Sequence, residues 1–132
     1  MEFKIDITKH LFLMLLLTLC NFAAKGQLSG TYTIGNGGTY PSFEDAISDM
    51  ESFGINGPVV FNVFDGEYDE HVTLNNFTGS AQFGVTFQSL SGNPENVILK
   101  DQHFEPGSLN YNIYFRGAKN ITFKNITFLA EH

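Results

Sequence analysis

The densest group of residues able to do chemistry is the seven-residue segment DGEYDEH. It holds four carboxylates and one imidazole: Asp65, Glu67, Asp69, Glu70 and His71. Carboxylates in such numbers can exchange protons with a substrate, or can bind Ca²⁺, which takes about six to eight oxygen ligands. The run does not have the spacing of an EF-hand loop. We expect a solvated or structural turn here, with a calcium site at Asp65, Glu67 and Asp69 as the first alternative and catalysis as the second.

A second candidate is the segment DQHFEPG, in which Asp101, His103 and Glu105 stand at alternate positions. On an extended chain all three side chains would lie on one face. One imidazole and two carboxylates could bind a metal ion. A Pro-Gly pair follows at once, and we therefore favour a polar loop. His71 and His103 also lack the neighbours that a serine-histidine-aspartate site requires.

The glycine-rich segment YTIGNGGTYPSF lies where a nucleotide-binding loop would lie, between a possible strand and a helix. Gly35 and Gly37 match the first two glycines of that motif, but Tyr40 occupies the third position and Pro41 follows it. The backbone could not approach a pyrophosphate closely, and no lysine is placed as in a P-loop. We interpret the segment as a turn and expect no cofactor.

A helix is predicted over residues 42–53, directly after this turn. Ser42 is a suitable N-cap with Asp45 as its acidic partner, and Gly54 is a stop signal. Apolar residues recur at helical spacing, at Phe43, Ala46, Ile47, Met50 and Phe53. The helix must therefore cover an apolar surface with a single stripe.

The rest of the chain is a series of short strand signals separated by turn residues, which predicts an all-β fold. The segments are residues 59–64, 71–74, 84–89, 96–100, 112–117, 120–123 and 125–128. A meander or a sandwich would give similar segments. Two interleaved series, Val59, Val85, Ile113 and Val72, Val97, Ile121, repeat about every 25 residues, which favours a solenoid. We predict a parallel β-helix with coils of about 25 residues and at least two strands per coil.

The first 26 residues read as a signal peptide. Leu11–Cys20 is an uncharged apolar run that is too short to span a membrane, and small residues precede a cleavage site after Gly26. Cys20 stands where a lipoprotein would be lipidated, but Leu19 replaces the small residue of that pattern, and we do not expect lipid anchoring. We expect a secreted or cell-surface protein without a membrane span after cleavage.

The predicted mature chain is strongly acidic. Of 14 Asp and Glu and 7 Lys and Arg, the signal peptide holds two acids and three bases, which leaves twelve acids against four bases. A formal charge of −8 argues against binding to a nucleic-acid backbone. No cysteine remains, so disulfides cannot contribute to stability.

The stretch GTYPSFEDAI…GPVVFNVFDGEYDEHVTL resembles the opening of right-handed parallel β-helix proteins of the pectin lyase-like superfamily. It is most similar to the start of pectinesterases and of secreted bacterial β-helix proteins. The matching residues are Gly38, Tyr40, Phe43, Ala46, Ile47, Val63, Gly66, Tyr68, Glu70, Val72 and Leu74. The resemblance implies a capping helix, a strand, a structural turn at Gly66, Tyr68 and Glu70, and a second strand.

The repeated phrase Asn-Ile-Thr-Phe at residues 120–123 and 125–128 resembles the paired strands of that superfamily. We expect Asn120 and Asn125 to serve the tight corners between strands, since asparagine tolerates the left-handed conformation. This use explains them better than glycosylation does, although Asn76, Asn120 and Asn125 all lie in sequons. We expect the organisation 1–26 signal peptide, 27–58 strand and capping helix, and 59–132 β-helix coils that are cut off at the C-terminus.

Three functions fit these features. The first is an extracellular carbohydrate-binding or adhesion module, and the second is part of a polysaccharide-acting enzyme. The resemblance places the enzyme's paired aspartates and arginine on later coils; Arg116 lacks the surrounding pattern, so we expect this chain alone to be inactive. The third is a structural stalk.

Overall fold

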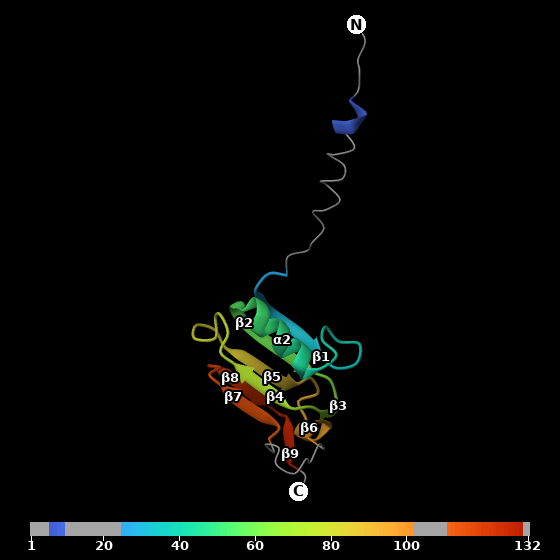
Figure 1. Cartoon of the computed structure of the whole chain (residues 1–132). Coiled ribbons are helices and arrows are strands. Elements are labelled where there is room, and N and C mark those ends of the chain that lie inside the picture. Colours follow the sequence, from blue (N-terminus) through green and yellow to red (C-terminus); the bar gives the residue numbers. More distant parts are fainter. Residues whose placement is uncertain (1–5, 10–24, 102–110, 131–132) are drawn as a thin grey trace, which may run out of the picture.

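The computed structural model describes residues 6–9, 25–101 and 111–130 (Figure 1). Within residues 25–101 and 111–130, short β-strands predominate and one α-helix lies across one end of them. The elements in chain order are β1 (Leu28–Ile34), α2 (Phe43–Phe53), β2 (Ile55–Val63), β3 (Gly66–Asp69), β4 (Val72–Asn75), β5 (Val85–Ser89), the 3₁₀ turn η1 (Pro94–Asn96), β6 (Val97–Asp101), β7 (Ile113–Arg116), β8 (Ile121–Lys124) and β9 (Thr127–Ala130).

The strands form three parallel sheets. The first sheet has the order β1-β2-β5-β8, the second β3-β6-β9 and the third β4-β7. The chain forms β1 and β2 in the first sheet, passes to the second at β3 and the third at β4, and then returns to the first at β5. It repeats this circuit from β5 to β7 and begins it again at β8 and β9. We call this arrangement the stack.

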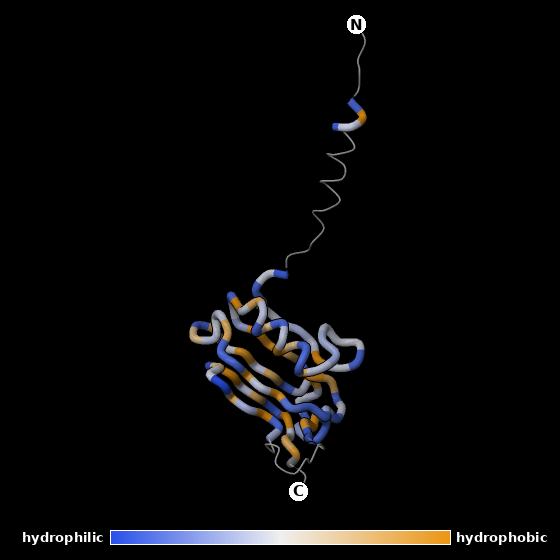
Figure 2. The backbone as a smooth tube through the Cα atoms, in the orientation of Figure 1, coloured by the Kyte–Doolittle hydropathy of each residue, from blue (hydrophilic) through white to orange (hydrophobic). Residues whose placement is uncertain are grey.

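The core of the stack is built from residues at matching positions of successive strands. In the first sheet Phe61 pairs with Phe87, and Phe87 pairs with Phe123. The rings of Phe61 and Phe87 stack with centroids 4.8 Å apart, and those of Phe87 and Phe123 with centroids 5.0 Å apart. Apolar and polar stretches alternate along the stack (Figure 2), and in β5 and β8 the phenylalanine stands between two polar residues. We call the three rings the aromatic column.

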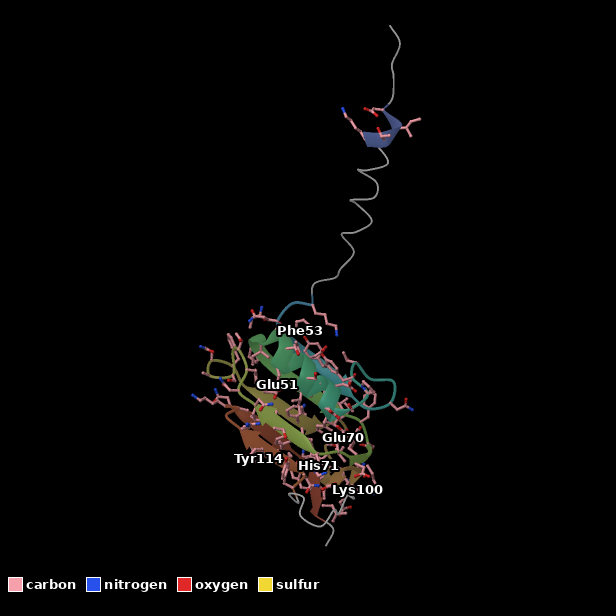
Figure 3. The ribbon with its side chains drawn as sticks, in the orientation of Figure 1. Glu51, Phe53, Glu70, His71, Lys100 and Tyr114 are labelled. Carbon is pink, nitrogen blue, oxygen red and sulfur yellow. The ribbon has the colours of Figure 1, made fainter. Side chains whose placement is uncertain are left out.

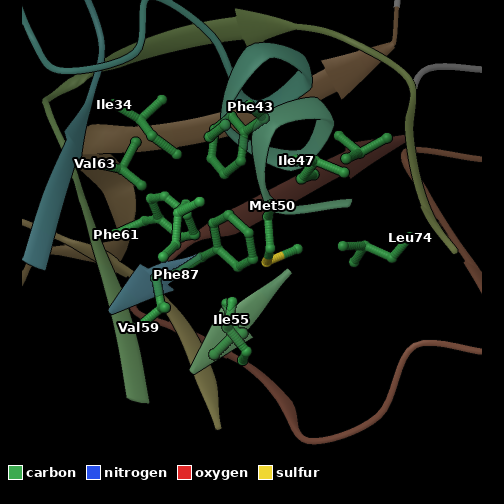
Figure 4. Close-up of a cluster of buried hydrophobic side chains, with 14 of the residues drawn as sticks. Ile34, Phe43, Ile47, Met50, Ile55, Val59, Phe61, Val63, Leu74 and Phe87 are labelled. Carbon is green, nitrogen blue, oxygen red and sulfur yellow. The ribbon is translucent and has the colours of Figure 1, made fainter. Parts of the chain in front are cut away.

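Helix α2 begins and ends as the sequence predicts. The side chain of Ser42 accepts a hydrogen bond from the Asp45 amide at 3.0 Å, and Gly54 forms the C-cap with a positive φ of 72°. The buried face of the helix consists of Phe43, Ala46, Ile47 and Met50. These side chains join Phe61 and Phe87 in one cluster (Figure 4). The helix therefore covers the β1 end of the core, and β1 extends the first sheet at the same end.

The predicted alignment of the strands is partly wrong. Val85 pairs with Val59, as expected, but it pairs on its other side with Ile121 and not with Ile113. Ile113 pairs instead with Val72 in the third sheet, and Val97 pairs with Gly66 in the second. Connections of different length separate equivalent strands, so that Val59 and Val85 are 26 residues apart whereas Val72 and Ile113 are 41 apart. A constant period of about 25 residues does not hold for this chain.

The segment predicted to be a turn at Gly66, Tyr68 and Glu70 is mostly a strand. Residues Gly66–Asp69 form β3, which pairs in parallel with β6. Each circuit consequently contains three strands. The sequence pattern does not predict this strand, because β3 has no β-branched residue and its only aromatic side chain, Tyr68, is flanked by acids.

The corners at Asn120 and Asn125 adopt the left-handed conformation, with φ of 56° and 54°. This confirms the predicted use of both residues. The Asn120 side-chain amide also donates to the carbonyl of Ser80 at 2.9 Å. The two residues thus set the directions of β8 and β9, which lie in different sheets.

Several predictions concern residues outside the described ranges. These are the apolar run with Cys20 and the pair His103 and Glu105. Among the residues that the structure describes, no helix has the length and apolar character needed to cross a membrane.

We predict that Phe87→Ala lowers the free energy of unfolding by about 3 to 5 kcal/mol, because it leaves a cavity in the middle of the aromatic column. The matched control is Leu90→Ala one residue beyond β5, where the leucine is 55% exposed; its effect should be within about 0.5 kcal/mol of zero. Urea unfolding followed by circular dichroism measures both. Equal losses in the two variants would contradict the described core.

Candidate functional site

Glu70 binds the N-terminus of α2. One carboxylate oxygen accepts a hydrogen bond from the Phe43 amide at 3.2 Å, and the other accepts from the Glu44 amide at 2.9 Å. These amides belong to the first turn of the helix, where no backbone carbonyl is available as a partner. The positive end of the helix dipole also favours a carboxylate here. Glu70 is therefore an anchor for the covering helix.

Two opposing effects set the pKa of Glu70. Burial raises the pKa, because the charged form loses its hydration, and nearby Glu44 and Asp45 raise it further; the two amide hydrogen bonds lower it. Burial is the largest of these, and the pKa lies above the ordinary value of 4.5. The helix is thus held by a carboxyl group that takes up a proton more readily than an exposed glutamate.

Tyr68 and Gly35 fix the approach to this end of the helix. The Tyr68 hydroxyl donates to the carbonyl of Phe64 at 2.8 Å, and its ring meets that of Phe43 edge-on at 5.2 Å. Gly35 has a φ of 131°, and a Cβ there would lie 2.8 Å from the Tyr68 hydroxyl oxygen. The glycine-rich segment is accordingly a turn between β1 and α2, as its sequence predicts.

The other acids of the segment have separate partners. Asp65 accepts hydrogen bonds from the Ser91 hydroxyl at 2.7 Å and from the Asn96 amide at 3.1 Å. Glu67 forms an ion pair with Lys100 at 2.6 Å, and Asp69 is exposed at the end of β3. Across the described ranges, no three His, Cys, Asp or Glu side chains are grouped so that they could hold a metal ion. The calcium site stays a prediction.

His71 and Asp101 come together although they are far apart in the sequence. The His71 Nε2 atom lies 3.0 Å from a carboxylate oxygen of Asp101, and the Nδ1 atom lies 3.1 Å from the carbonyl of Tyr111. The pair joins the start of β4 to the end of β6.

Two other residues considered in the sequence lie apart from this pair. Asn76 accepts a hydrogen bond from Ser80, and Arg116 is exposed on β7.

A polar groove runs between α2 and the start of β4, with a volume of about 300 Å³. It is lined by Glu44, Ser48, Glu51, Ser52, His71 and Thr73, among others. The Glu51 carboxylate already accepts hydrogen bonds from the backbone amide of Asn75 at 2.7 Å and from its side chain at 3.0 Å. Glu51 and Glu70 lie toward opposite ends of α2 (Figure 3). Glu51 therefore helps to hold the helix against the segment after β4.

A second hollow, of about 280 Å³, lies where β1 and the turn after it meet the other side of α2. Its lining includes Tyr32, Thr39, Tyr40 and Asp49, together with Lys25 and Gly26. The rings of Tyr32 and Tyr40 are 6.0 Å apart and inclined at 55°. Both rings pack on Phe61, so they are supported from below by the aromatic column. We call this place the tyrosine hollow.

Charged groups meet at the edge of the tyrosine hollow. The Lys25 ammonium lies 2.8 Å from a carboxylate oxygen of Asp49 and 5.9 Å from the centre of the Phe53 ring. Burial and the negative charge of the neighbouring Asp49 carboxylate raise the pKa of Tyr40 to about 12. Tyr40 is therefore a neutral hydrogen-bonding group throughout the physiological pH range. The lining of the hollow includes two tyrosine rings, the Tyr40 hydroxyl group and the Asp49 carboxylate, whereas the Tyr32 hydroxyl donates to the Ser29 carbonyl at 3.0 Å.

The sequence gives no signal for this hollow. Tyr32 lies on β1, Tyr40 on the turn and Asp49 on the solvent side of α2, and no motif links the three positions. Tyr40 does belong to the residues of the family resemblance, but there as a structural residue.

Comparison with protein-family models, with curated proteins and with solved structures finds no match.

We predict that the free energy of unfolding of the unmodified chain, minus that of the Glu70→Gln variant, falls as pH rises. The folded state binds the Glu70 proton more tightly than the unfolded state does. The contribution of the Glu70 proton to the free energy of unfolding has its full value below pH 4.5 and is lost as pH rises through the raised pKa of the folded state. Urea unfolding between pH 4 and pH 8 measures the difference, with Glu67→Gln as the matched control for loss of one exposed charge. A difference that grows with pH would mean that the amide hydrogen bonds outweigh burial.

Proposed function

We propose that this protein is a secreted carbohydrate-binding module built on a right-handed parallel β-helix of the pectin lyase-like kind. The proposed ligand is a neutral polysaccharide, and the proposed binding site is the tyrosine hollow. The observation that carries the proposal is the placement of Tyr32, Tyr40 and Asp49 around one hollow. Three parallel sheets visited in a repeating order, with a helix across one end, support the fold.

The chemistry of the tyrosine hollow suits a sugar ring. A sugar presents C–H groups on its faces and hydroxyl groups at its edge. Aromatic rings pack against the faces, and a carboxylate accepts hydrogen bonds from hydroxyl groups. With Lys25 and Gly26 in place, the hollow has a volume of about 280 Å³, close to the lower end of the range for small-molecule sites, about 300 Å³.

Cleavage of the predicted signal peptide would change the charges at this site. Lys25 pairs with Asp49, and cleavage after Gly26 would remove the lysine. The carboxylate of Asp49 would then face the hollow without a cation beside it. We infer that the chain from Gln27 onward binds saccharide more tightly than the complete chain does.

The charge of the mature chain favours a neutral ligand over an acidic one. Its formal charge of −8 and the carboxylate of Asp49 both repel uronic acids. A neutral glucan or xylan fits these features better than a polygalacturonate.

The test is isothermal titration calorimetry of residues 27–132 with cellohexaose, xylohexaose and hexagalacturonate. We expect binding of at least one neutral oligosaccharide and none of hexagalacturonate. Tyr32→Ala should weaken binding about tenfold or more, which corresponds to about 1.4 kcal/mol, because it removes one aromatic face. Asp49→Asn, which preserves shape, should weaken binding because it removes the negative charge and replaces one of the two acceptor oxygens by an amide donor.

The matched control is Tyr114→Ala, since Tyr114 is an exposed tyrosine on β7 outside the hollow. Tyr32→Phe is a second control, because it removes only the hydroxyl that donates to the Ser29 carbonyl. Both controls should bind as the unmodified chain does. Failure of all neutral saccharides to bind, or equal loss in Tyr114→Ala and Tyr32→Ala, would contradict the proposal.

A further inference from the structure

The rim of the tyrosine hollow already holds one ammonium group, that of Lys25. Its Nζ atom lies 2.8 Å from a carboxylate oxygen of Asp49 and 5.9 Å from the centre of the Phe53 ring. Asp49 and Phe53 are four residues apart on α2, so their side chains are neighbours on the helix surface. Phe53 lies at the end of α2 that the incoming chain passes (Figure 3). A carboxylate and an aromatic face around one nitrogen are the groups that recognise a cation.

Lys25 is held more loosely than the groups that it contacts. Its side chain is 63% exposed, whereas the side chain of Asp49 is 23% exposed. An ion pair with so exposed a partner contributes little to stability, because water solvates the ammonium and the long side chain loses freedom in the pair. Of the described residues that line the hollow, Asp49 is the only acid and Lys25 the only base. The carboxylate and the Phe53 ring are therefore fixed parts of α2, and the ammonium between them can be exchanged at small cost.

An amino sugar has both of the features that this hollow can bind. The C–H groups of its ring pack against aromatic faces, as those of a neutral sugar do. Its protonated amino group has donors only, and a hydrogen bond from a charged donor to a carboxylate is stronger than one from a hydroxyl group. The formal charge of −7 on the chain also attracts a cationic ligand. The hollow should therefore discriminate between a sugar with an amino group and one with a hydroxyl group.

We propose that Asp49 and Phe53 form an ammonium subsite of the tyrosine hollow, and that the hollow binds an amino-sugar polymer more tightly than the neutral polymer of the same linkage. This inference rests on the proposed saccharide-binding function and adds a substrate class to it. One amino group of the ligand takes the place of the Lys25 ammonium, between the Asp49 carboxylate and the Phe53 ring. The sugar ring that carries it packs on Tyr32 and Tyr40.

The test compares two hexasaccharides that share one linkage. Cellohexaose and the β-1,4-linked hexamer of glucosamine differ at one position of each ring, where the second has an amino group in place of a hydroxyl group. Both are titrated by calorimetry into the complete chain and into its Lys25→Ala variant, at mildly acidic pH, where the amino groups are protonated. The measured quantity is the dissociation constant of cellohexaose divided by that of the glucosamine hexamer, which we call the preference.

We expect a preference of about five- to tenfold or more in the Lys25→Ala variant, from the charged hydrogen bond and the aromatic ring together. In the unmodified chain the Lys25 ammonium competes for the subsite, so the preference there should be at least about threefold smaller. The matched control is Lys119→Ala, which removes an exposed lysine from the connection between β7 and β8. It should change the preference by less than about twofold.

Variants of the subsite are made in the Lys25→Ala background. Asp49→Asn should lower the preference at least about fivefold, because the amide has no charge and one acceptor oxygen. Phe53→Leu should lower it about two- to threefold, because it removes the aromatic face. The matched control is Glu44→Gln, which removes one acid of the same helix from the polar groove on its other side. Circular dichroism checks that each variant is folded.

Three results would overturn the ammonium subsite. One is equal binding of the two hexamers to the Lys25→Ala variant, and the saccharide-binding function would then still stand. Another is an equal loss of preference in Asp49→Asn and Glu44→Gln, since the attraction would come from the acidic chain as a whole. The third is binding of Nα-acetyl-lysine amide as tight as that of the glucosamine hexamer, which would assign the site to a lysine side chain of a polypeptide.

One further result separates the two proposals in the opposite sense. Binding of the glucosamine hexamer that Asp49→Asn weakens, without any binding of cellohexaose, would support the ammonium subsite and contradict the proposal of a neutral ligand.

Discussion

In-register stacking of side chains is the constraint on which the rest of the molecule depends. Phe61, Phe87 and Phe123 occupy one position in three successive strands, and their rings form a continuous column. Burial of such rings contributes about 1.5 to 3 kcal/mol each. A column of this kind is stabilised from strand to strand, but it always has two ends. Each end must be covered by something other than the repeating strand.

At one end the covering is a helix, and its attachment explains the acidic segment that first suggests chemistry. Glu70 holds the first turn of α2, and Glu51 ties the last turn to Asn75. The helix is thereby fixed at both ends across the core. The tyrosine hollow forms on the other side of this helix, where β1 and the following turn pass it. A structural requirement of the stack thus creates the hollow that we propose as a ligand site.

Local signals predict the elements well and their pairing poorly. The cap at Ser42, the stop at Gly54 and the left-handed corners at Asn120 and Asn125 depend on neighbouring residues, and the sequence reveals them. The partner of Val85 depends on the length of the connections around the stack, which no local pattern encodes. The same holds for the tyrosine hollow, because Tyr32, Tyr40 and Asp49 meet only when β1, the turn and α2 are assembled.

Helix α2 closes one end of the stack, and β7, β8 and β9 are the last strands that the structure describes at the other end. Strand-resolved hydrogen exchange of the unliganded chain tests this difference between the two ends of the stack. We expect slow exchange in β2, β5 and α2, with amides of β7, β8 and β9 exchanging at least about tenfold faster on average, since edge strands open at lower free energy. Exchange in β7, β8 and β9 that is as slow as in β5 would contradict it.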